Sequence, residues 1–140
     1  MRGGKGVKAL PLPAWTGAAI ALAMRLRSDI FVSLLVRRVF AAGGFAAVER
    51  KGAESAGAIF VRQRFRDGLE TLYGPAPQSF FDDEKSGDRL FEIRLERGKP
   101  DAAAAVLDRE IKFDSDLWVV ELEGDDVTDI IPVANERDIR

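Results

Sequence analysis

The chain of 140 residues contains no cysteine and no histidine. The absence of cysteine excludes disulfide scaffolds, thiol redox chemistry and thiolate zinc sites. The absence of histidine excludes Ser-His-Asp and Cys-His catalytic arrangements, together with metal centres built on imidazole. No repeat of solenoid or propeller length is found either. The sequence therefore predicts a soluble globular domain that does not use these chemistries.

Motifs of catalysis are also scarce. The run Gly3-Gly4-Lys5-Gly6 lacks the spacing and the hydroxyl residue of a phosphate-binding loop, and no Gly-x-Ser-x-Gly sequence occurs. Acid–base chemistry would depend on carboxylates, lysines or Tyr73. A pair of carboxylates in a cleft stays an alternative, because spacing alone does not exclude it. The scarcity of such motifs favours a protein that is not an enzyme, and we expect no catalytic residue and no cofactor.

The composition that remains, 46% hydrophobic and 31% charged, is that of one folded domain. Such a chain buries roughly two thirds of its unfolded surface, and it is too apolar for a disordered protein. Its charges are divided unevenly: residues 24–66 carry nine basic and three acidic side chains, whereas residues 67–140 carry nine basic and twenty acidic ones. Either the two halves neutralise one another across the fold, which we favour, or the basic half forms a nucleic-acid-binding face.

The first 23 residues differ from the rest of the chain. A basic, glycine-rich start and an apolar stretch ending in Ala21-Leu22-Ala23 are typical of a secretory signal. Pro11 and Pro13 shorten the apolar part, which is far below the roughly twenty residues of a membrane-spanning helix. We favour translation from Met24, with a signal peptide or a flexible extension as alternatives. We therefore expect a cytoplasmic protein without membrane contact, secreted only if residues 1–23 are a signal peptide.

The apolar periodicity and the turn residues predict two helices and five strands. We expect the helices at 28–42 and 101–113, and the strands at 45–50, 58–66, 69–73, 89–97 and 117–123. This order favours an α+β domain over residues 24–123: a mostly antiparallel sheet of about five strands with two helices packed on one face. Residues 124–140 are expected to form a loose acidic tail with one apolar patch at Ile130-Ile131.

The first predicted helix is apolar around most of its circumference. Ser28 and Asp29 are expected to cap its N-terminus, and Gly43-Gly44 to end it. Such a helix is either buried between the sheet and other elements or partly used as a subunit interface. A homodimer through this helix is therefore one alternative for the assembly.

Three other elements have one apolar face. In the strand at 89–97 this face consists of Phe91, Ile93 and Leu95, with Glu92, Arg94 and Glu96 opposite. In the second helix it is formed by Ala103, Val106, Leu107 and Ile111, and in the last strand by Trp118, Val120 and Leu122.

The hairpin around Asp67-Gly68 is the best local candidate for a binding site. With a two-residue turn, Arg62 lies opposite Tyr73 and Arg64 opposite Thr71. Arg62, Arg64 and Arg66 then share a face with Tyr73, where they could follow phosphates and stack a base. The alternatives are a partner protein, or a solvated face whose arginines pair with Glu92, Glu96 or the acids of the tail.

The segment after this hairpin is stiff, because Pro75 and Pro77 enclose a single residue next to Tyr73. A stiff loop loses little entropy on docking, which suits a recognition surface, although proline also commonly ends a strand. Phe80-Phe81, which follow, are expected in the core.

Three acidic clusters contain the oxygen ligands that calcium and magnesium prefer. Two are Asp82-Asp83-Glu84 and the group of Asp125, Asp126 and Asp129. The third, Asp114-Ser115-Asp116, begins like a calcium loop but lacks the glycine and the distal glutamate at the required spacing. Charge runs of this kind are usually solvated, so we expect no metal.

Three segments resemble a small bacterial family, domain of unknown function 1491. They are RLRSDIFV at 25–32, LYGPAPQ at 72–78 and FDSDLWVVE at 113–121. The resemblance covers roughly residues 24–123 and implies a single small domain that begins near Met24. It implies no catalytic residue, because the family is named for its lack of an assigned function.

The sequence thus favours a non-enzymatic protein-binding or regulatory module whose partner is another protein. The candidate binding residues are Arg62, Arg64, Arg66, Tyr73, Pro75 and Pro77. A nucleic-acid-binding module that uses the three arginines, and a small carboxylate-dependent enzyme, remain the alternatives.

Overall fold

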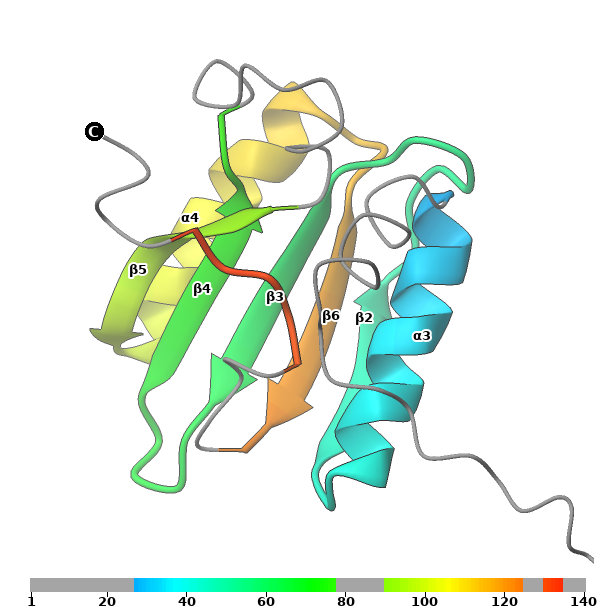
Figure 1. Ribbon diagram of the computed structural model, residues 1–140. Helices are drawn as coiled ribbons and strands as arrows, with labels where there is room; N and C mark the ends of the chain where they lie inside the picture. The colour runs from blue at the N-terminus through cyan, green and yellow to red at the C-terminus, as the bar shows by residue number, and fades with distance from the viewer. Residues whose placement is uncertain (1–26, 78–89, 125–129, 135–140) are drawn as a thin grey trace, which may run out of the picture.

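The computed structural model describes residues 27–77, 90–124 and 130–134, which form two helices and one five-stranded sheet (Figure 1). In chain order the elements are α3 (Ser28–Ala41), β2 (Phe45–Arg50), β3 (Ile59–Arg64), β4 (Glu70–Pro75), β5 (Phe91–Gly98), α4 (Pro100–Phe113) and β6 (Trp118–Glu123). The strand order is β2-β6-β3-β4-β5, with β3 parallel to β6 and the other neighbours antiparallel. The predicted α+β class and mostly antiparallel sheet are confirmed.

The two helices cover opposite faces of the sheet, which corrects the prediction that both pack on one face (Figure 1). Alternate residues of β3 enter different clusters: Ile59 and Val61 pack with α3, whereas Phe60 packs with Leu107 of α4. Because β3 is apolar on both sides, a single layer of helices would leave one set of these side chains in water.

The larger cluster also includes Trp118, Val120 and Leu122 of β6, which share a face as predicted. Leu117 and Val119 belong to the smaller cluster on the other side. The stripe predicted for α4 is confirmed, since Ala103 and Leu107 are buried and Val106 and Ile111 pack against the smaller cluster.

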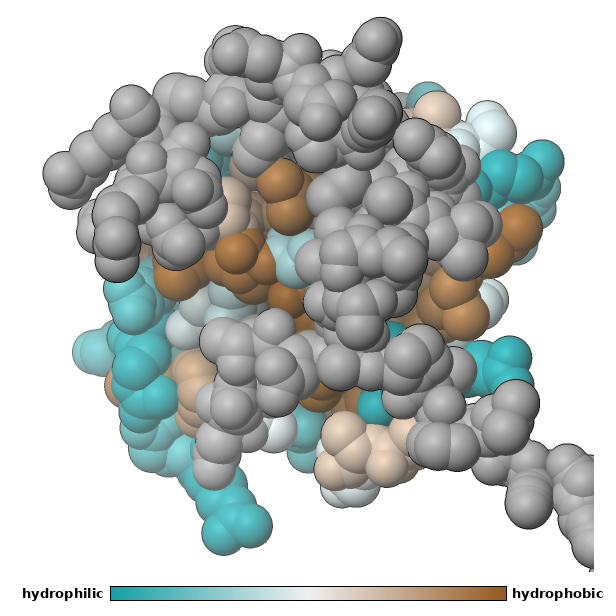
Figure 2. Space-filling view, in the orientation of Figure 1, coloured by the Kyte–Doolittle hydropathy of each residue, from teal (hydrophilic) through white to brown (hydrophobic). Residues whose placement is uncertain are grey.

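The helix α3 buries one side and exposes the other. Phe31, Val32, Leu35 and Val39 are buried, whereas Ile30 and Phe40 are exposed, and Figure 2 shows hydrophobic surface over this helix. The predicted cap is wrong, because the Ser28 hydroxyl donates to the carbonyl of Gly57 (2.7 Å) and no side chain caps the helix. The predicted end at Gly43-Gly44 is confirmed.

The register of the β3–β4 hairpin differs by one residue from the prediction. Val61 pairs with Tyr73, Arg62 with Leu72 and Arg64 with Glu70. A two-residue type I′ turn needs positive φ at both central residues, but here Gly68 has φ +89° and Asp67 does not have positive φ. The connection is therefore a three-residue loop closed by a hydrogen bond from Phe65 N to Leu69 O. The shift places Tyr73 on the opposite face from Arg62 and Arg64.

The strand β5 does not alternate strictly as predicted. Tyr73 pairs with Ile93 but Leu72 pairs with Leu95, so Arg94 is the extra residue of a bulge. As a result, Phe91 lies in the cluster with α3, whereas Leu95 packs against the cluster with α4.

Residues 130–134, assigned from the sequence to the acidic tail, pack against the domain. Ile131 is fully buried in the larger cluster. Phe91 N donates to Pro132 O, and Ala134 N donates to Phe91 O. This segment, red in Figure 1, therefore covers the face of the sheet that it shares with α3.

The loop between β2 and β3 makes a close approach to the α4–β6 connection. Ala53 N donates to Asp116 O, and the indole of Trp118 donates to Ala53 O (2.7 Å). A Cβ on Gly57 would lie 2.4 Å from Asp116 O, which is a backbone atom that cannot rotate away.

We predict that Gly57→Ala lowers the free energy of unfolding by about 2 kcal/mol, because the backbone must move to accept the methyl group. Urea unfolding followed by circular dichroism measures the difference. Ser55→Ala, at an exposed position of the same loop, is the control and should remain within about 0.5 kcal/mol of the wild type. Equal midpoints for the two variants would contradict the close approach.

Candidate functional site

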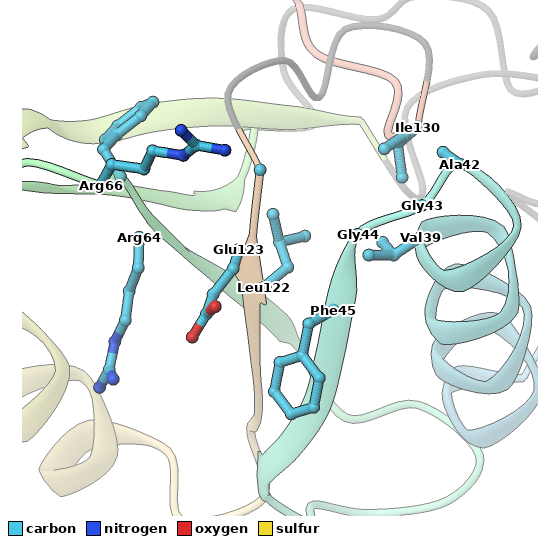
Figure 3. Close-up of a pocket in the computed structure, with 12 residues that line it drawn as sticks. Val39, Ala42, Gly43, Gly44, Phe45, Arg64, Arg66, Leu122, Glu123 and Ile130 are labelled. Carbon is cyan, nitrogen blue, oxygen red and sulfur yellow. The ribbon is translucent and has the colours of Figure 1, made fainter.

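A pocket of about 760 Å³ opens at one end of the sheet (Figure 3). Three structural parts meet there: the turn from α3 to β2, the end of β3 and the end of β6. The two strand ends are both carboxyl ends, because β3 and β6 are parallel neighbours. Ligands of open sheets commonly bind outside the carboxyl ends of parallel strands. The described lining residues are Val39, Ala42, Gly43, Gly44, Phe45, Arg64, Phe65, Arg66, Leu122, Glu123, Gly124 and Ile130.

The pocket extends around the end of the sheet to both of its faces. Leu122 belongs to the core on the α3 side, whereas Phe45 and Glu123 point in the opposite direction (Figure 3). Phe45 is 45% exposed, and its ring makes an edge-to-face contact with that of Phe40 at 5.8 Å between centroids. Apolar surface therefore continues from α3 across Phe45 into the pocket.

The polar side chains of the pocket are two arginines and one glutamate. Arg64 is held by Glu70 (3.2 Å) and Glu121 (3.0 Å). Neither Arg66 nor Glu123 forms an ion pair with another residue that the structure describes. No serine, threonine, lysine or tyrosine is among the described lining residues. The described lining residues thus present apolar side chains, two guanidinium groups and one carboxylate.

A network of ion pairs crosses four strands on the face of the sheet that α4 shares. Arg62 is buried and binds Glu70 (2.7 Å) on β4 and Glu49 (2.8 Å) on β2. Burial by itself lowers the pKa of Arg62, but the hydrogen bond to Glu70 and the two nearby carboxylates outweigh it and raise the pKa. Arg64 joins Glu70 to Glu121 of β6. The network thus holds β2, β3, β4 and β6 in register, and the pocket lies at the ends of three of these strands.

The six residues predicted for binding do not form one surface. Arg64 and Arg66 line the pocket, whereas Arg62 is buried in the ion-pair network. Pro75 lies at the opposite end of the sheet, followed by the exposed Pro77. Among the described residues, Arg62 and Arg64 form ion pairs with Glu49, Glu70 and Glu121, and not with the predicted partners Glu92 and Glu96. The binding roles themselves stay predictions.

Tyr73 supports the pocket indirectly. It is only 7% exposed, and its hydroxyl donates to Gln63 Oε1 (2.9 Å). The Gln63 amide in turn donates to the carbonyl of Gly124 (2.7 Å), a lining residue. This chain of hydrogen bonds holds the end of β6 in place.

Sequence reasoning missed Phe45 and Glu123 as site residues. Phe45 begins a strand directly after two glycines, where a large apolar residue usually indicates core. Glu123 ends a strand, where a carboxylate usually indicates solvent. Only the meeting of the strand ends with the α3–β2 turn brings the two residues to one pocket.

Nothing in the described ranges contains a group of three or more carboxylates placed to hold a metal ion. The clusters at 82–84 and at 125–129, and Phe80-Phe81, lie outside these ranges. In the same part of the chain, neither helix is long and apolar enough to cross a membrane.

We predict that Arg62→Met lowers the free energy of unfolding by about 3 kcal/mol, because Glu70, 3% exposed, loses its closest cation. Adding Glu70→Leu should recover part of this loss, since it removes a buried carboxylate that would have only Arg64 as its partner. Arg66→Met, which removes an exposed guanidinium, is the control and should change stability by less than about 0.5 kcal/mol. Urea unfolding would refute the interpretation if Arg62→Met and Arg66→Met had the same midpoint.

Comparisons with known proteins identify relatives of this chain. Residues 26–132 match the model of a family described as protein of unknown function (DUF1491). A protein from A. tumefaciens, known from a solution structure, is 61% identical, with a TM-score of 0.72 over 80% of this chain and 97% of that chain. No match is found among curated proteins.

Two structures of a DUF1491 family protein from Caulobacter crescentus CB15 also match. The crystal structure is 31% identical, with a TM-score of 0.64 over 79% of this chain and 99% of that chain. The NMR structure is 32% identical, with a TM-score of 0.65 over 79% and 98%. Together with the match over residues 26–132, they confirm the resemblance of the three sequence segments: the chain belongs to the DUF1491 family.

Proposed function

We propose that this protein is a non-enzymatic binding module that takes a segment of a partner protein in the pocket at the carboxyl ends of β3 and β6. The observation that carries the proposal is Phe45, an aromatic ring that is almost half exposed, lines the pocket and contacts the exposed ring of Phe40. Exposed aromatic residues of this kind are the usual anchors of protein interfaces.

The charges at the pocket suit a peptide better than a nucleic acid. Arg66 can accept a carboxylate and Glu123 an ammonium or guanidinium group, so both signs of charge are available around an apolar centre. Carboxylates hold Arg62 and Arg64, two of the three arginines that a nucleic-acid interface would use. The nucleic-acid alternative therefore has less support, and a second copy of this chain remains one form that the partner protein could take.

The test is capture of a partner from the native cell lysate by the full chain and by two matched variants. Phe45→Asp places a charge in the pocket, whereas Phe113→Asp makes the same change at the C-terminal end of α4, where the ring is 89% exposed. We expect the Phe45 variant to capture at least about ten-fold less partner, in line with the loss of an interface anchor. Circular dichroism confirms that both variants are folded.

The control variant should capture as much partner as the wild type. The proposal is wrong if Phe45→Asp captures the same proteins in the same amounts, or if Phe113→Asp loses them equally. Light scattering of the purified chain distinguishes a second copy from a different partner. Nucleic acid that elutes as salt rises, from the wild type and not from Arg66→Ala, which leaves the ion-pair network intact, would support the alternative.

A further inference from the structure

A second pocket lies at the other end of the sheet and is much smaller, about 230 Å³. The β2–β3 loop, the end of β4, the start of β5 and the residue after α4 surround it. Two of the three segments that carry the family resemblance contribute to it, through Pro75 and Asp114. Its described lining residues are Ala56, Gly57, Ala58, Ile59, Pro75, Leu90, Phe91 and Asp114.

The volume of this pocket limits the size of the ligand that it can bind. Pockets for drug-sized molecules and cofactors have volumes of roughly 300–1,000 Å³. A pocket of about 230 Å³ is below that range, so it suits a ligand smaller than a drug-sized molecule or a cofactor, such as one side chain. Its walls are partly apolar, and the hydrocarbon comes mainly from the half-buried Pro75 and Leu90, because Ile59 and Phe91 are fully buried. Such walls suit the methylene stem of a long side chain.

The charge of the pocket has one sign. Asp114 is the only ionisable residue among the described lining residues. It directly follows the last residue of α4, where the backbone carbonyls of a helix carry partial negative charge. Asp116 N donates to Asp114 Oδ1 (2.9 Å), so the carboxylate is held in place. Carboxylate and helix end together favour a cation at this position.

The two arginines nearby, Arg94 and Arg50, do not form an ion pair with the Asp114 carboxylate. Arg94 reaches Pro75 O (2.6 Å), but its charge is held by Glu92 and Glu110. Arg50 donates to Ser115 O (2.9 Å) in the same α4–β6 connection, which shows that this backbone accepts a guanidinium group. Within the described part of the chain, Asp114 forms no ion pair.

We propose that this second pocket binds a lysine or arginine side chain of a partner protein, with the methylene stem against Pro75 and Leu90 and the cationic group at Asp114. The inference rests on the proposed function only in that it takes the partner to be a protein. The two sites lie at opposite ends of the sheet, so a partner could reach both only by extending along the domain.

The test uses small side-chain analogues and the full chain labelled with ¹⁵N. The probes are n-butylammonium and n-propylguanidinium, with 1-butanol as the neutral analogue and butyrate as the anionic one. We expect both cations to shift the amide signals of Gly57, Ala58, Ile59 and Phe91 in a saturable way that weakens as salt rises. Butanol should bind at least about two-fold more weakly, and butyrate should leave these signals unchanged.

Two variants separate charge from shape. Asp114→Asn keeps an oxygen for the hydrogen bond from Asp116 N, and it should weaken cation binding about two- to five-fold, as expected for a partly exposed ion pair. Ala56→Leu should fill the pocket and abolish the shifts for all probes. Asp108→Asn removes an exposed carboxylate elsewhere on α4 and should bind like the wild type.

The proposal is overturned if butanol binds as tightly as butylammonium, if Asp114→Asn and Asp108→Asn behave alike, or if the shifted amides lie away from this pocket. These results are independent of the proposed function. The probes report only on the pocket at Asp114, whereas capture of a partner through Phe45 is measured at the other end of the sheet.

Discussion

The need to cover β3 and β6 on both faces determines the architecture of this domain. Ile59 and Val61 of β3 require a hydrophobic layer on one side, and Phe60 requires another on the other side. The helix α3 and residues 130–134 form the first layer, and α4 forms the second. Because parallel neighbouring strands need a long connection, the chain passes through β4, β5 and α4 before β6 returns beside β3. The connection between the parallel strands β3 and β6 therefore contains α4, the helix that covers the second face of the sheet.

Part of the face shared with α4 is stabilised by charge instead of hydrocarbon. Arg62 and Arg64 of β3 form ion pairs with Glu49, Glu70 and Glu121, which lie on three other strands of the sheet. Buried pairs of this kind contribute little net stability, but they are costly to break singly, so they favour one arrangement of the strands. Arg62 and Arg64 are thereby held by carboxylates, and of the two arginines that line the pocket it is Arg66 that forms no ion pair with a residue that the structure describes.

The two pockets differ in a way that follows from the strand ends around them. At the carboxyl ends of β3 and β6, the wide pocket combines exposed aromatic surface with charges of both signs. At the opposite end, the smaller pocket combines hydrocarbon of Pro75 and Leu90 with a single carboxylate beside the end of α4. Neither set of described lining residues contains a hydroxyl, thiol or amine nucleophile.

The sequence by itself determined the order and type of the elements, the apolar stripe of α4, the alternation of β6 and the family, because these depend on local periodicity or on residue identity. Tertiary structure decided the rest. Positive φ at Gly68 without positive φ at Asp67 accompanies a three-residue loop, which shifts the hairpin by one residue from the prediction, and the bulge at Arg94 places Leu95 on the other face. Contacts between segments far apart in the chain decide the remaining features. They determine which helix covers which face of the sheet, which carboxylates bind Arg62, and how Phe45 and Glu123 come to line the same pocket. Periodicity along one segment contains no information about such contacts, so only the folded chain could settle them.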